Sequence, residues 1–455
     1  MSIHSSLVET VSKQVRLENV PFTFLSVSTD TRKHAEQSLF VPLKGERFNG
    51  HQFLDQAIAA GAIAAFWDEG ESLPDQLPDS FQVYFVEDTL VALQQLAKTY
   101  RNQVNPFIIG ITGSNGKTTT KDMICELLGG EEFVHKTLGN LNNHIGVPLT
   151  LLAMPKDCKY AVIEMGMNHA GEIALLSEIA QPNAAVVTNI GEAHIEHLGS
   201  REGIAAAKME IATGLKQQKW LIVDGDERLL SDYEDWNPVK IGFSDDVDVP
   251  LTEIQSVGSG YTFSLGSEKG WSIHLLGKHN VKNVAYAIWI ARKLGISQTI
   301  IQERINKIKI SGMRLEQVSG PNGSTFINDA YNANPTSMKA AIKTIKELPG
   351  YQERVLVLGD IYELGPDEEW LHKSVAEVID WPITVVITVG EKGRWIYEAI
   401  KEKECDCLRT YHATSVEAAA NHLNQYLKQD TVVLLKASRR LALEHVLPAV
   451  KGGHQ

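Results

Sequence analysis

The stretch Phe107-Ile108-Ile109-Gly110-Ile111-Thr112-Gly113-Ser114-Asn115-Gly116-Lys117-Thr118-Thr119-Thr120 decides the fold of this chain. Its apolar first part predicts a buried strand over 107–111, and the residues after Thr118 are typical of a helix start. A glycine-rich turn between strand and helix can direct backbone N–H groups toward phosphate oxygens. The turn follows the short pattern G-x-x-G-K-T and not G-x-x-x-x-G-K-[ST]. We therefore predict an ATP- or GTP-binding turn, against the alternative of a tight turn without a ligand.

Side chains that could hold magnesium lie in and after this turn. Lys117 can place a positive charge beside the terminal phosphates, and the Thr118 hydroxyl can coordinate Mg²⁺. Glu164 ends an apolar run and can hold the same ion, or it can simply be an acid at a strand end. His194 can add to a Mg²⁺ or Mn²⁺ site, or it can lie on a surface loop. Its H-x-x-H spacing with His197 does not indicate zinc, because no further ligands follow at zinc spacing.

Composition and charge limit the class of protein. The 455 residues suffice for several domains with their own cores. The net charge of -13 argues against nucleic acid or an anionic membrane surface as a partner, because both require a positive field. No apolar run approaches the ~20 residues of a membrane helix, and the first residues lack a signal-peptide pattern. The four cysteines are Cys125, Cys158, Cys405 and Cys407, and only the last two are close in sequence, in a C-x-C pattern that is weak evidence for a metal site. We therefore expect a cytoplasmic enzyme with reduced cysteines.

Short apolar runs alternate with amphipathic stretches, which is typical of α/β architecture. In the middle of the chain these runs end in polar residues: Glu164, then Thr188 and Asn189, then Asp224. Ligands of open α/β sheets bind beyond the carboxyl ends of strands, where these side chains would lie. The stretch 245–276 is instead typical of antiparallel hairpins.

The pattern predicts three domains. Residues 1–104 form a smaller N-terminal α/β domain, with helices near 52–61 and 90–101. Residues 105–314 form a central domain around the P-loop-type sheet. Residues 315–455 form a domain of doubly wound type, with strand-like runs at 326–329, 355–360, 383–390 and 431–436.

Further polar residues allow more than one interpretation. Lys208 lies in a helix-forming stretch, where the sequence alone favours a solvated lysine. A desolvated lysine would instead become a neutral amine, which can take up CO₂ as a metal-binding carbamate. Asn280 can present a donor and an acceptor to adenine, or it can cap a helix. Asp329, Asp360 and the run 436–439 follow strands, and together they predict a polar rim that faces the ligand of the central domain.

With these segments assembled, the chain resembles the Mur ligases, the ATP-dependent amide ligases of peptidoglycan precursor synthesis. The resemblance runs from about residue 25 to 445. It rests on ordered motifs, which are Thr29–Arg32, Leu43–Phe48, Thr112–Thr119, Gly139–Asn143, Ile145–Pro148, Glu164–Asn168, Thr188–His194, Lys208–Glu210, Gly312–Glu316, Asp329–Pro335 and Gly359–Gly365. The segments 142–143 and 331–335 point to the branch that adds D-alanyl-D-alanine.

The resemblance implies a role for each domain: the N-terminal domain holds the UDP end of the substrate, the central domain binds ATP, and a C-terminal Rossmann-like domain binds the dipeptide and closes over both. It implies as ATP contacts Gly113, Ser114, Asn115, Gly116, Lys117, Thr118, Thr119, Asn280, Arg314 and Asp329. Two Mg²⁺ ions would be held by Thr118, Glu164, His194 and a carbamylated Lys208. The implied catalytic residues are Lys117, Glu164, His194 and Lys208. The implied UDP-muramoyl contacts are Thr31, Arg32, Lys44, Asn140, Asn143 and Asn168. Those near the dipeptide are Asn332, Asp360, Lys436 and Ser438.

The implied reaction joins D-Ala-D-Ala to UDP-N-acetylmuramoyl-tripeptide through an acyl phosphate, in a protein for which a monomer is favoured. A sibling ligase that adds another amino acid is the nearest alternative. A nucleotide-controlled binding protein of GTPase type is another, although no guanine-reading N-K-x-D occurs. Thr31, His144 and Ala437 replace the family's usual serine, acid and glycine. The methyl group of Ala437 could shift the loop that carries the expected dipeptide contacts. This replacement also leaves a third alternative, a scaffold protein that has lost catalytic activity.

Overall fold

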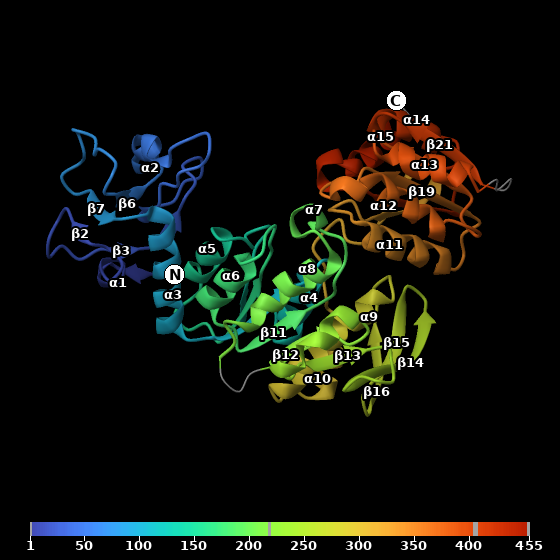
Figure 1. Cartoon of the computed structure of the whole chain (residues 1–455), viewed down its shortest axis with the longest axis horizontal. Helices are drawn as coiled ribbons and strands as arrows, with labels where there is room; N and C mark the ends of the chain where they lie inside the picture. Colours follow the sequence, from blue (N-terminus) through green and yellow to red (C-terminus); the bar gives the residue numbers. More distant parts are fainter. Residues whose placement is uncertain (1, 217–219, 404–407, 453–455) are drawn as a thin grey trace.

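The computed structural model describes residues 2–216, 220–403 and 408–452. Figure 1 shows three bodies along the long axis, with the N-terminal one (blue) and the C-terminal one (orange to red) on either side of the central one. Each is built on its own sheet, as the α/β prediction requires. A small antiparallel pair, β1 (Ile3–His4) with β3 (Thr23–Phe24), lies beside the first. Cys405 and Cys407, considered above for metal binding, lie outside the described residues.

The N-terminal sheet has the order β2-β7-β6-β5-β4, parallel except for β2 against β7. Its strands are β2 (Gln14–Val15), β4 (Ser26–Ser28), β5 (Ser38–Phe40), β6 (Ala62–Asp68) and β7 (Gln82–Val86). The helices of this part are α1 (Ser5–Glu9), α2 (Leu54–Ala59) and the long α3 (Thr89–Val104), so both predicted helices are confirmed. Buried residues of α3 belong to one continuous core that includes residues of the N-terminal and the central sheets.

The central sheet has the order β16-β15-β14-β13-β12-β11-β8-β10-β9. Its strands are β8 (Phe107–Thr112), β9 (Val134–Lys136), β10 (Tyr160–Glu164), β11 (Ala184–Val187), β12 (Trp220–Asp224), β13 (Val239–Gly242), β14 (Val249–Val257), β15 (Gly260–Leu265) and β16 (Glu268–Ile273). β8 is buried on both faces, with Ile108 in one core and Ile109 in the other, which explains its unbroken apolar run. The predicted hairpins are confirmed, because β14, β15 and β16 pair antiparallel.

Helices cover both faces of the central sheet. They are α4 (Lys117–Leu127), α5 (Gly146–Leu152), α6 (Glu172–Ala180), α7 (Ile195–Leu198), α8 (Arg201–Met209), α9 (His279–Lys293) and α10 (Gln298–Ile305). β8 lies between β10 and β11, and the chain crosses from one side of β8 to the other after β10. The carboxyl end of β8 is therefore a switch point, where α/β sheets bind ligands. Within the described residues, no helix combines the length and the apolar character needed to cross a membrane.

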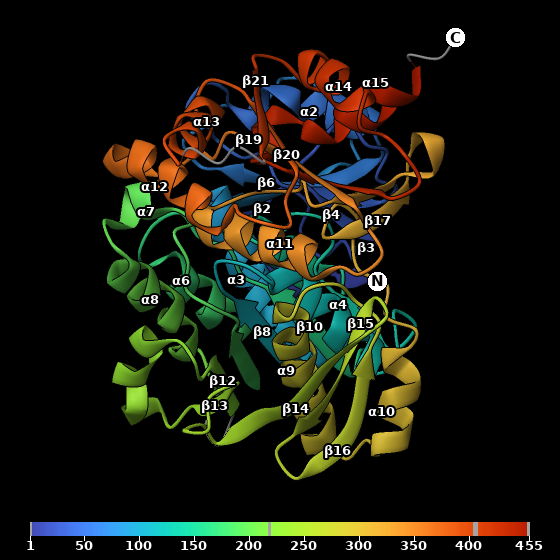
Figure 2. The same ribbon diagram turned by 90° about the vertical axis from the view of Figure 1, so that its right-hand side faces the viewer.

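The C-terminal sheet has the order β17-β18-β22-β19-β20-β21, parallel except for β17 against β18. Its strands are β17 (Glu316–Ser319), β18 (Thr325–Asn328), β19 (Glu353–Gly359), β20 (Val385–Val389), β21 (Arg409–Ala413) and β22 (Thr431–Lys436). Helices α11 (Pro335–Glu347), α12 (Glu368–Ser374), α13 (Gly393–Lys401), α14 (Val416–Asn424) and α15 (Val446–Gly452) pack on its two faces, as a doubly wound sheet requires. In both views α11 lies on the side that faces the central body (Figures 1 and 2).

Candidate active site

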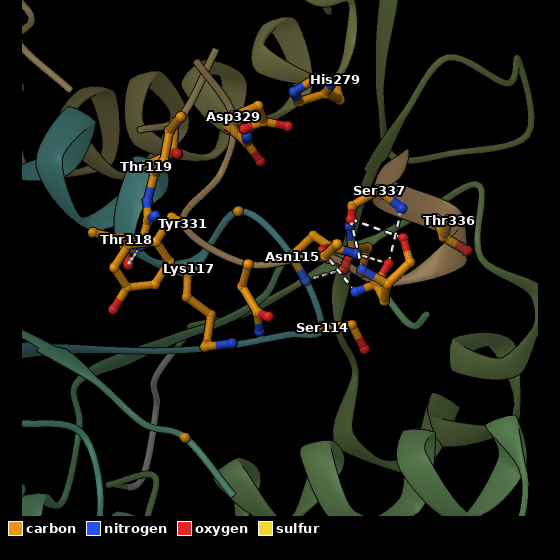
Figure 3. Close-up of a pocket in the computed structure, with 18 of the residues that line it drawn as sticks. Ser114, Asn115, Lys117, Thr118, Thr119, His279, Asp329, Tyr331, Thr336 and Ser337 are labelled. Carbon is orange, nitrogen blue, oxygen red and sulfur yellow. Dashed lines mark hydrogen bonds between the residues drawn. The ribbon is translucent and has the colours of Figure 1, made fainter. Parts of the chain in front are cut away.

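A cavity of about 540 Å³ lies where the central and C-terminal parts meet. Its lining includes the whole turn from Ser114 to Thr119, residues beyond β10 and β11, the start of α9, and residues 329–341 of the C-terminal part. Cavities of this size hold small molecules and cofactors. The phosphate turn and two members of the predicted rim, Asp329 and Lys436, therefore line a single space, whereas Asp360 and residues 437–439 of that rim do not line it. Figure 3 shows Lys117 and Asp329 among the residues around this space.

The turn after β8 has a backbone that only glycine allows. Gly113 has a φ of 145°, and an added Cβ would lie 1.9 Å from the Oγ1 of Thr188. Gly116 has a φ of 81°, and its Cβ would lie 2.9 Å from the Oδ1 of Asn283. Gly116 begins α4 without a side-chain cap. In the described chain no acceptor pairs with the N–H groups of residues 117–119, so this helix start can receive phosphate oxygens.

Thr118 and Glu164 are joined directly. The Thr118 hydroxyl donates to Glu164 Oε2 over 2.8 Å and accepts from Arg314 Nη2 over 2.8 Å. Glu164 is 3% exposed, and its Oε1 accepts a hydrogen bond of 2.9 Å from the amide of Asn142. The Arg314 guanidinium stacks over the ring of Tyr331 at 3.9 Å. These contacts bring together the Arg314 guanidinium, which can bind an anion, and the Thr118 hydroxyl and the two Glu164 oxygens, which can bind a cation.

Lys117 and Lys208 both line the cavity. Lys117 Nζ donates to the carbonyl oxygen of Gly113 over 2.7 Å, and burial lowers its pKa. Lys208 is 2% exposed, so the solvated lysine favoured by the sequence alone is wrong: α8 turns this side chain toward the cavity. No acceptor within the described residues pairs with its ammonium. Burial, together with the charge of Lys117, holds the pKa of Lys208 well below its usual range.

His194 lies at the boundary with the C-terminal part and lines the cavity. Its Nδ1 is 2.7 Å from Oε2 of Glu363, and it takes a left-handed φ of 65° just before α7. His197 is exposed and lies beside His169, with 4.8 Å between the ring centres. No cluster of three or more His, Cys, Asp or Glu side chains suited to a metal occurs in the described ranges. A metal beside Thr118 and Glu164 would therefore depend on hydroxyl and carbamate oxygens as well.

Asn280 and Asp329 also line the cavity. The alternative that Asn280 caps a helix is wrong, because Lys278 precedes α9 as its cap residue. The Asn280 amide donates to the carbonyl oxygen of Leu276 over 2.7 Å and leaves its oxygen to Asn283. Asp329 accepts from the N–H of Leu315 over 3.1 Å and forms a 2.5 Å ion pair with Lys436.

Comparisons with known proteins agree with this geometry. Family models described as the Mur ligase middle domain, the Mur ligase glutamate ligase domain and the Mur ligase catalytic domain match residues 111–291, 313–439 and 23–101. The chain is 47% identical over 424 residues to UDP-N-acetylmuramoyl-tripeptide--D-alanyl-D-alanine ligase of Bacillus subtilis (strain 168), covering 92% of each protein. The chain belongs to the Mur ligase family. The expected resemblance is thereby confirmed.

Solved structures of Mur ligases have the same fold. A crystal structure of MurF from Acinetobacter baumannii matches 99% of both chains with a TM-score of 0.87 and 30% identity. The MurF ligase from Thermotoga maritima, solved in complex with ADP, matches 94% of this chain and 97% of its own with a TM-score of 0.81 and 27% identity. The three-domain α/β Mur ligase fold is therefore the fold of this chain.

Some predicted substrate contacts of this Mur ligase line the cavity and others do not. Those that line it are Asn140, Asn143, Asn168, Asn332 and Lys436. Thr31, Arg32 and Lys44 belong to the N-terminal part, away from this space. Thr31 borders a small hollow, Arg32 pairs with Asp30 over 2.8 Å, and Lys44 pairs with Asp68 over 2.8 Å.

Asp360 and Ser438 lie outside the lining of the cavity. Asp360 Oδ1 instead accepts the N–H groups of Lys392 and Gly393 over 2.9 and 2.7 Å, and Ser438 Oγ accepts the N–H of Tyr362 over 3.0 Å. Ala437, the replacement for the family glycine, is fully buried and does not take a left-handed φ. Its methyl group is accommodated beside Gly359, where an added Cβ would lie only 2.8 Å from it.

Several residues of the site were not predicted. Asn142 holds Glu164, and Tyr331 supports Arg314. Asn189 Oδ1 accepts the N–H of Asn115 over 2.8 Å. The sequence did carry a signal for Asn189, since it follows a strand, but only the folded loop shows which group it holds.

Proposed function

We propose that this Mur ligase joins D-alanyl-D-alanine to UDP-N-acetylmuramoyl-tripeptide, cleaving ATP to ADP and phosphate and giving the UDP-N-acetylmuramoyl-pentapeptide of peptidoglycan synthesis. The observation that carries the proposal is the unpaired start of α4, which opens into a cavity walled by the C-terminal sheet. It is supported by the activity named for the Bacillus subtilis relative, which matches over 92% of both lengths, and by ADP in the Thermotoga maritima structure.

The reaction requires activation, because a carboxylate and an ammonium do not form an amide unaided in water. A carboxylate oxygen of the tripeptide attacks the γ-phosphorus of ATP, and the bond between this phosphorus and the β,γ-bridging oxygen breaks to release ADP. The amine of D-Ala-D-Ala then attacks the acyl carbon, the C–O bond to phosphate breaks, and the nitrogen loses a proton. Enclosure between two domains protects the acyl phosphate from water.

The residues of the cavity suit the charge that develops in the first step. The N–H groups of α4 and the cations of Lys117 and Arg314 surround the position of the terminal phosphates, where they offset repulsion between two anions. Asn280 and Asp329 also line the cavity, and we assign them to the adenosine part of ATP. Residues 113–119, together with Asn280, Arg314 and Asp329, form the proposed ATP site.

Mg²⁺ and a carbamate on Lys208 fit the residues present. Thr118 and Glu164 place a hydroxyl and a carboxylate 2.8 Å apart, which are oxygen ligands of the kind Mg²⁺ prefers. Lys208 is a buried amine without an acceptor, and a carbamate would replace its costly positive charge by an oxygen anion. With His194 these groups would hold two Mg²⁺ ions. When bound, the ions neutralise phosphate charge and orient the γ-phosphoryl group.

Substrate contacts follow the domain arrangement. The UDP end would meet Thr31, Arg32 and Lys44 of the N-terminal domain (1–104), and the muramoyl part Asn140, Asn143 and Asn168 of the central domain (105–314). The dipeptide would meet the C-terminal domain (315–455) at Asn332 and Lys436. Asp360 and Ser438, which do not line the cavity, would support the dipeptide site through their contacts with the neighbouring backbone. We place the enzyme in the cytoplasm as a monomer, with Cys125 and Cys158 as free thiols.

The test is ADP release by the purified enzyme with UDP-N-acetylmuramoyl-tripeptide and a panel of acceptors. D-Ala-D-Ala should stimulate release, with ATP preferred to GTP. Stimulation by single amino acids and not by D-Ala-D-Ala would show a sibling ligase. A strict requirement for GTP without any acceptor effect would instead favour a nucleotide-controlled binding protein.

A further inference from the structure

Three segments that are distant in sequence meet beside the phosphate loop. They are the loop itself at 114–115, the chain after β11 at 188–192, and the start of α11 at 334–337. Figure 3 shows Asn115 of the loop turned toward the start of α11, where Thr336 and Ser337 lie. Gly191 sits at their centre, where an added Cβ would lie 3.3 to 3.5 Å from atoms of Asn115, Ser114 and Thr336.

The loop is held from both sides. Ser114 Oγ accepts the N–H of Gly191 over 2.9 Å, and Thr188 Oγ1 donates to the carbonyl oxygen of Asn115 over 2.5 Å. From the C-terminal part, the Asn334 amide donates to Asn115 Oδ1 over 2.9 Å, and the Asn115 amide donates back over 3.4 Å. The loop thus directly contacts the C-terminal domain, here called the acceptor domain because it is proposed to bind the dipeptide.

Glu192 makes a second link between the same two parts. Its carboxylate accepts the N–H of Thr336 over 3.1 Å and the Thr336 hydroxyl over 2.9 and 2.7 Å to its two oxygens. In the first turn of α11, Pro335 has no N–H, and the N–H of Ser337 is taken by the Asn334 side chain. Glu192 therefore satisfies the remaining donor at this helix start from another domain, where a negative charge is also favoured by the helix dipole.

The position of α11 matters because the helix forms a wall of the cavity. Residues 332–334, 336, 337, 340 and 341 line it opposite the phosphate loop. A shift of α11 would change the distance between the acceptor side and the phosphates without altering any ATP contact of α4. Small misplacements of this kind lower rates strongly while leaving binding groups in place.

We propose that Glu192 is a positioning residue of the ligase, which fixes α11 of the acceptor domain against the phosphate loop through Thr336. The proposal rests on the proposed function. Glu192 acts on the second step, because it sets where the dipeptide amine lies relative to the acyl phosphate. Glu192 itself is not among the residues that line the cavity.

The test compares Glu192→Ala, Thr336→Val and the double variant with the parent, and Glu178→Ala serves as the matched control. Glu178 is an exposed glutamate on α6 that takes part in none of these contacts. We expect the kcat of ligation to fall about tenfold in either single variant, with an unchanged KM for ATP. The double variant should be no worse than the singles, because both remove one interaction. Thr336→Ser, which keeps the donors, should retain parental kcat.

A second measurement does not depend on activity. Small-angle X-ray scattering of Glu192→Ala should show a larger radius of gyration than the parent, while the unfolding temperature stays near that of Glu178→Ala. Parental kcat in Glu192→Ala, additive losses in the double variant, or an unchanged radius of gyration would overturn the inference. An inactive parent would instead overturn the proposed function, and the scattering comparison would still stand.

Discussion

At the scale of one residue, Lys208 is expected to lower the stability of the protein while serving its function. Lys208 is 2% exposed, and its amine pairs with no acceptor in the described part of the chain, so its burial near a second lysine costs free energy. Such a cost is expected where the residue has a chemical role. Carbamylation would supply that role by turning the group into an anion.

We predict that Lys208→Met raises the free energy of unfolding in CO₂-free buffer by about 1–3 kcal/mol, because an apolar chain of similar size removes the cost of burying an amine that must lose its proton on folding. The same variant should lose ligase activity by at least about a hundredfold, if Lys208 carries the proposed carbamate that binds metal. Chemical denaturation and the ligase assay measure the two effects. A variant that is less stable than the parent, or as active, would contradict this account.

The pH dependence of stability should reveal the same group. The folded protein holds the pKa of Lys208 far below its unfolded value of about 10.4, so between these pKa values the unfolded state binds more protons. In CO₂-free buffer the parent should therefore gain unfolding free energy as pH rises from 7 toward 10. Lys208→Met should gain less over the same range. Parallel curves for the two proteins would exclude a depressed pKa at this position.

At the scale of elements, sequence patterns predicted well what depends on local order. The strand at 107–112 and the helix at 117–127 follow from an apolar run, glycines and a polar helix start. Short strands such as β9 and β13 were not predicted, because their residues mix polar with apolar side chains over three or four positions and form no continuous apolar run. Many of the predicted site residues line one cavity, but their contacts were not predicted. The pairing of Asn115 with Asn334, 219 positions away, depends on how two domains meet.

Helix α3 offers a test of an element that joins two sheets. Asp88 caps it, since its Oδ1 accepts the N–H of Val91 over 2.9 Å. We predict that Asp88→Ala costs about 1 kcal/mol of unfolding free energy, as the loss of a helix cap usually does. Exposed Asp79 makes no such bond, so Asp79→Ala should cost less than about 0.5 kcal/mol in the same denaturation assay. Equal losses of unfolding free energy in the two variants would show that the Asp88 cap does not stabilise α3.

At the scale of the whole molecule, the three bodies are not equally independent. Buried side chains of the N-terminal sheet, α3 and one face of the central sheet form a single core. The C-terminal sheet has its own core on each face. The bodies on either side of the proposed 104/105 boundary therefore share apolar surface, whereas the last body has nearly all of its core to itself.

We predict that residues 315–455 alone unfold cooperatively, because their two cores remain buried. Residues 105–455 should instead aggregate or bind hydrophobic dyes, since removal of α3 exposes one face of the central sheet. Circular dichroism during thermal unfolding and dye fluorescence measure these outcomes. A well-folded 105–455 fragment would contradict the shared core.

The central claim is that the γ-phosphoryl group of ATP passes to a peptide carboxyl at the loop formed by residues 113–119. The most direct measurement uses UDP-N-acetylmuramoyl-tripeptide labelled with oxygen-18 in its terminal carboxylate, together with ATP and D-Ala-D-Ala. Because the acyl phosphate keeps the attacking oxygen when its C–O bond breaks, we predict labelled oxygen in the released inorganic phosphate. Lys117→Ala should abolish this transfer. Pentapeptide formation with unlabelled phosphate would contradict the claim.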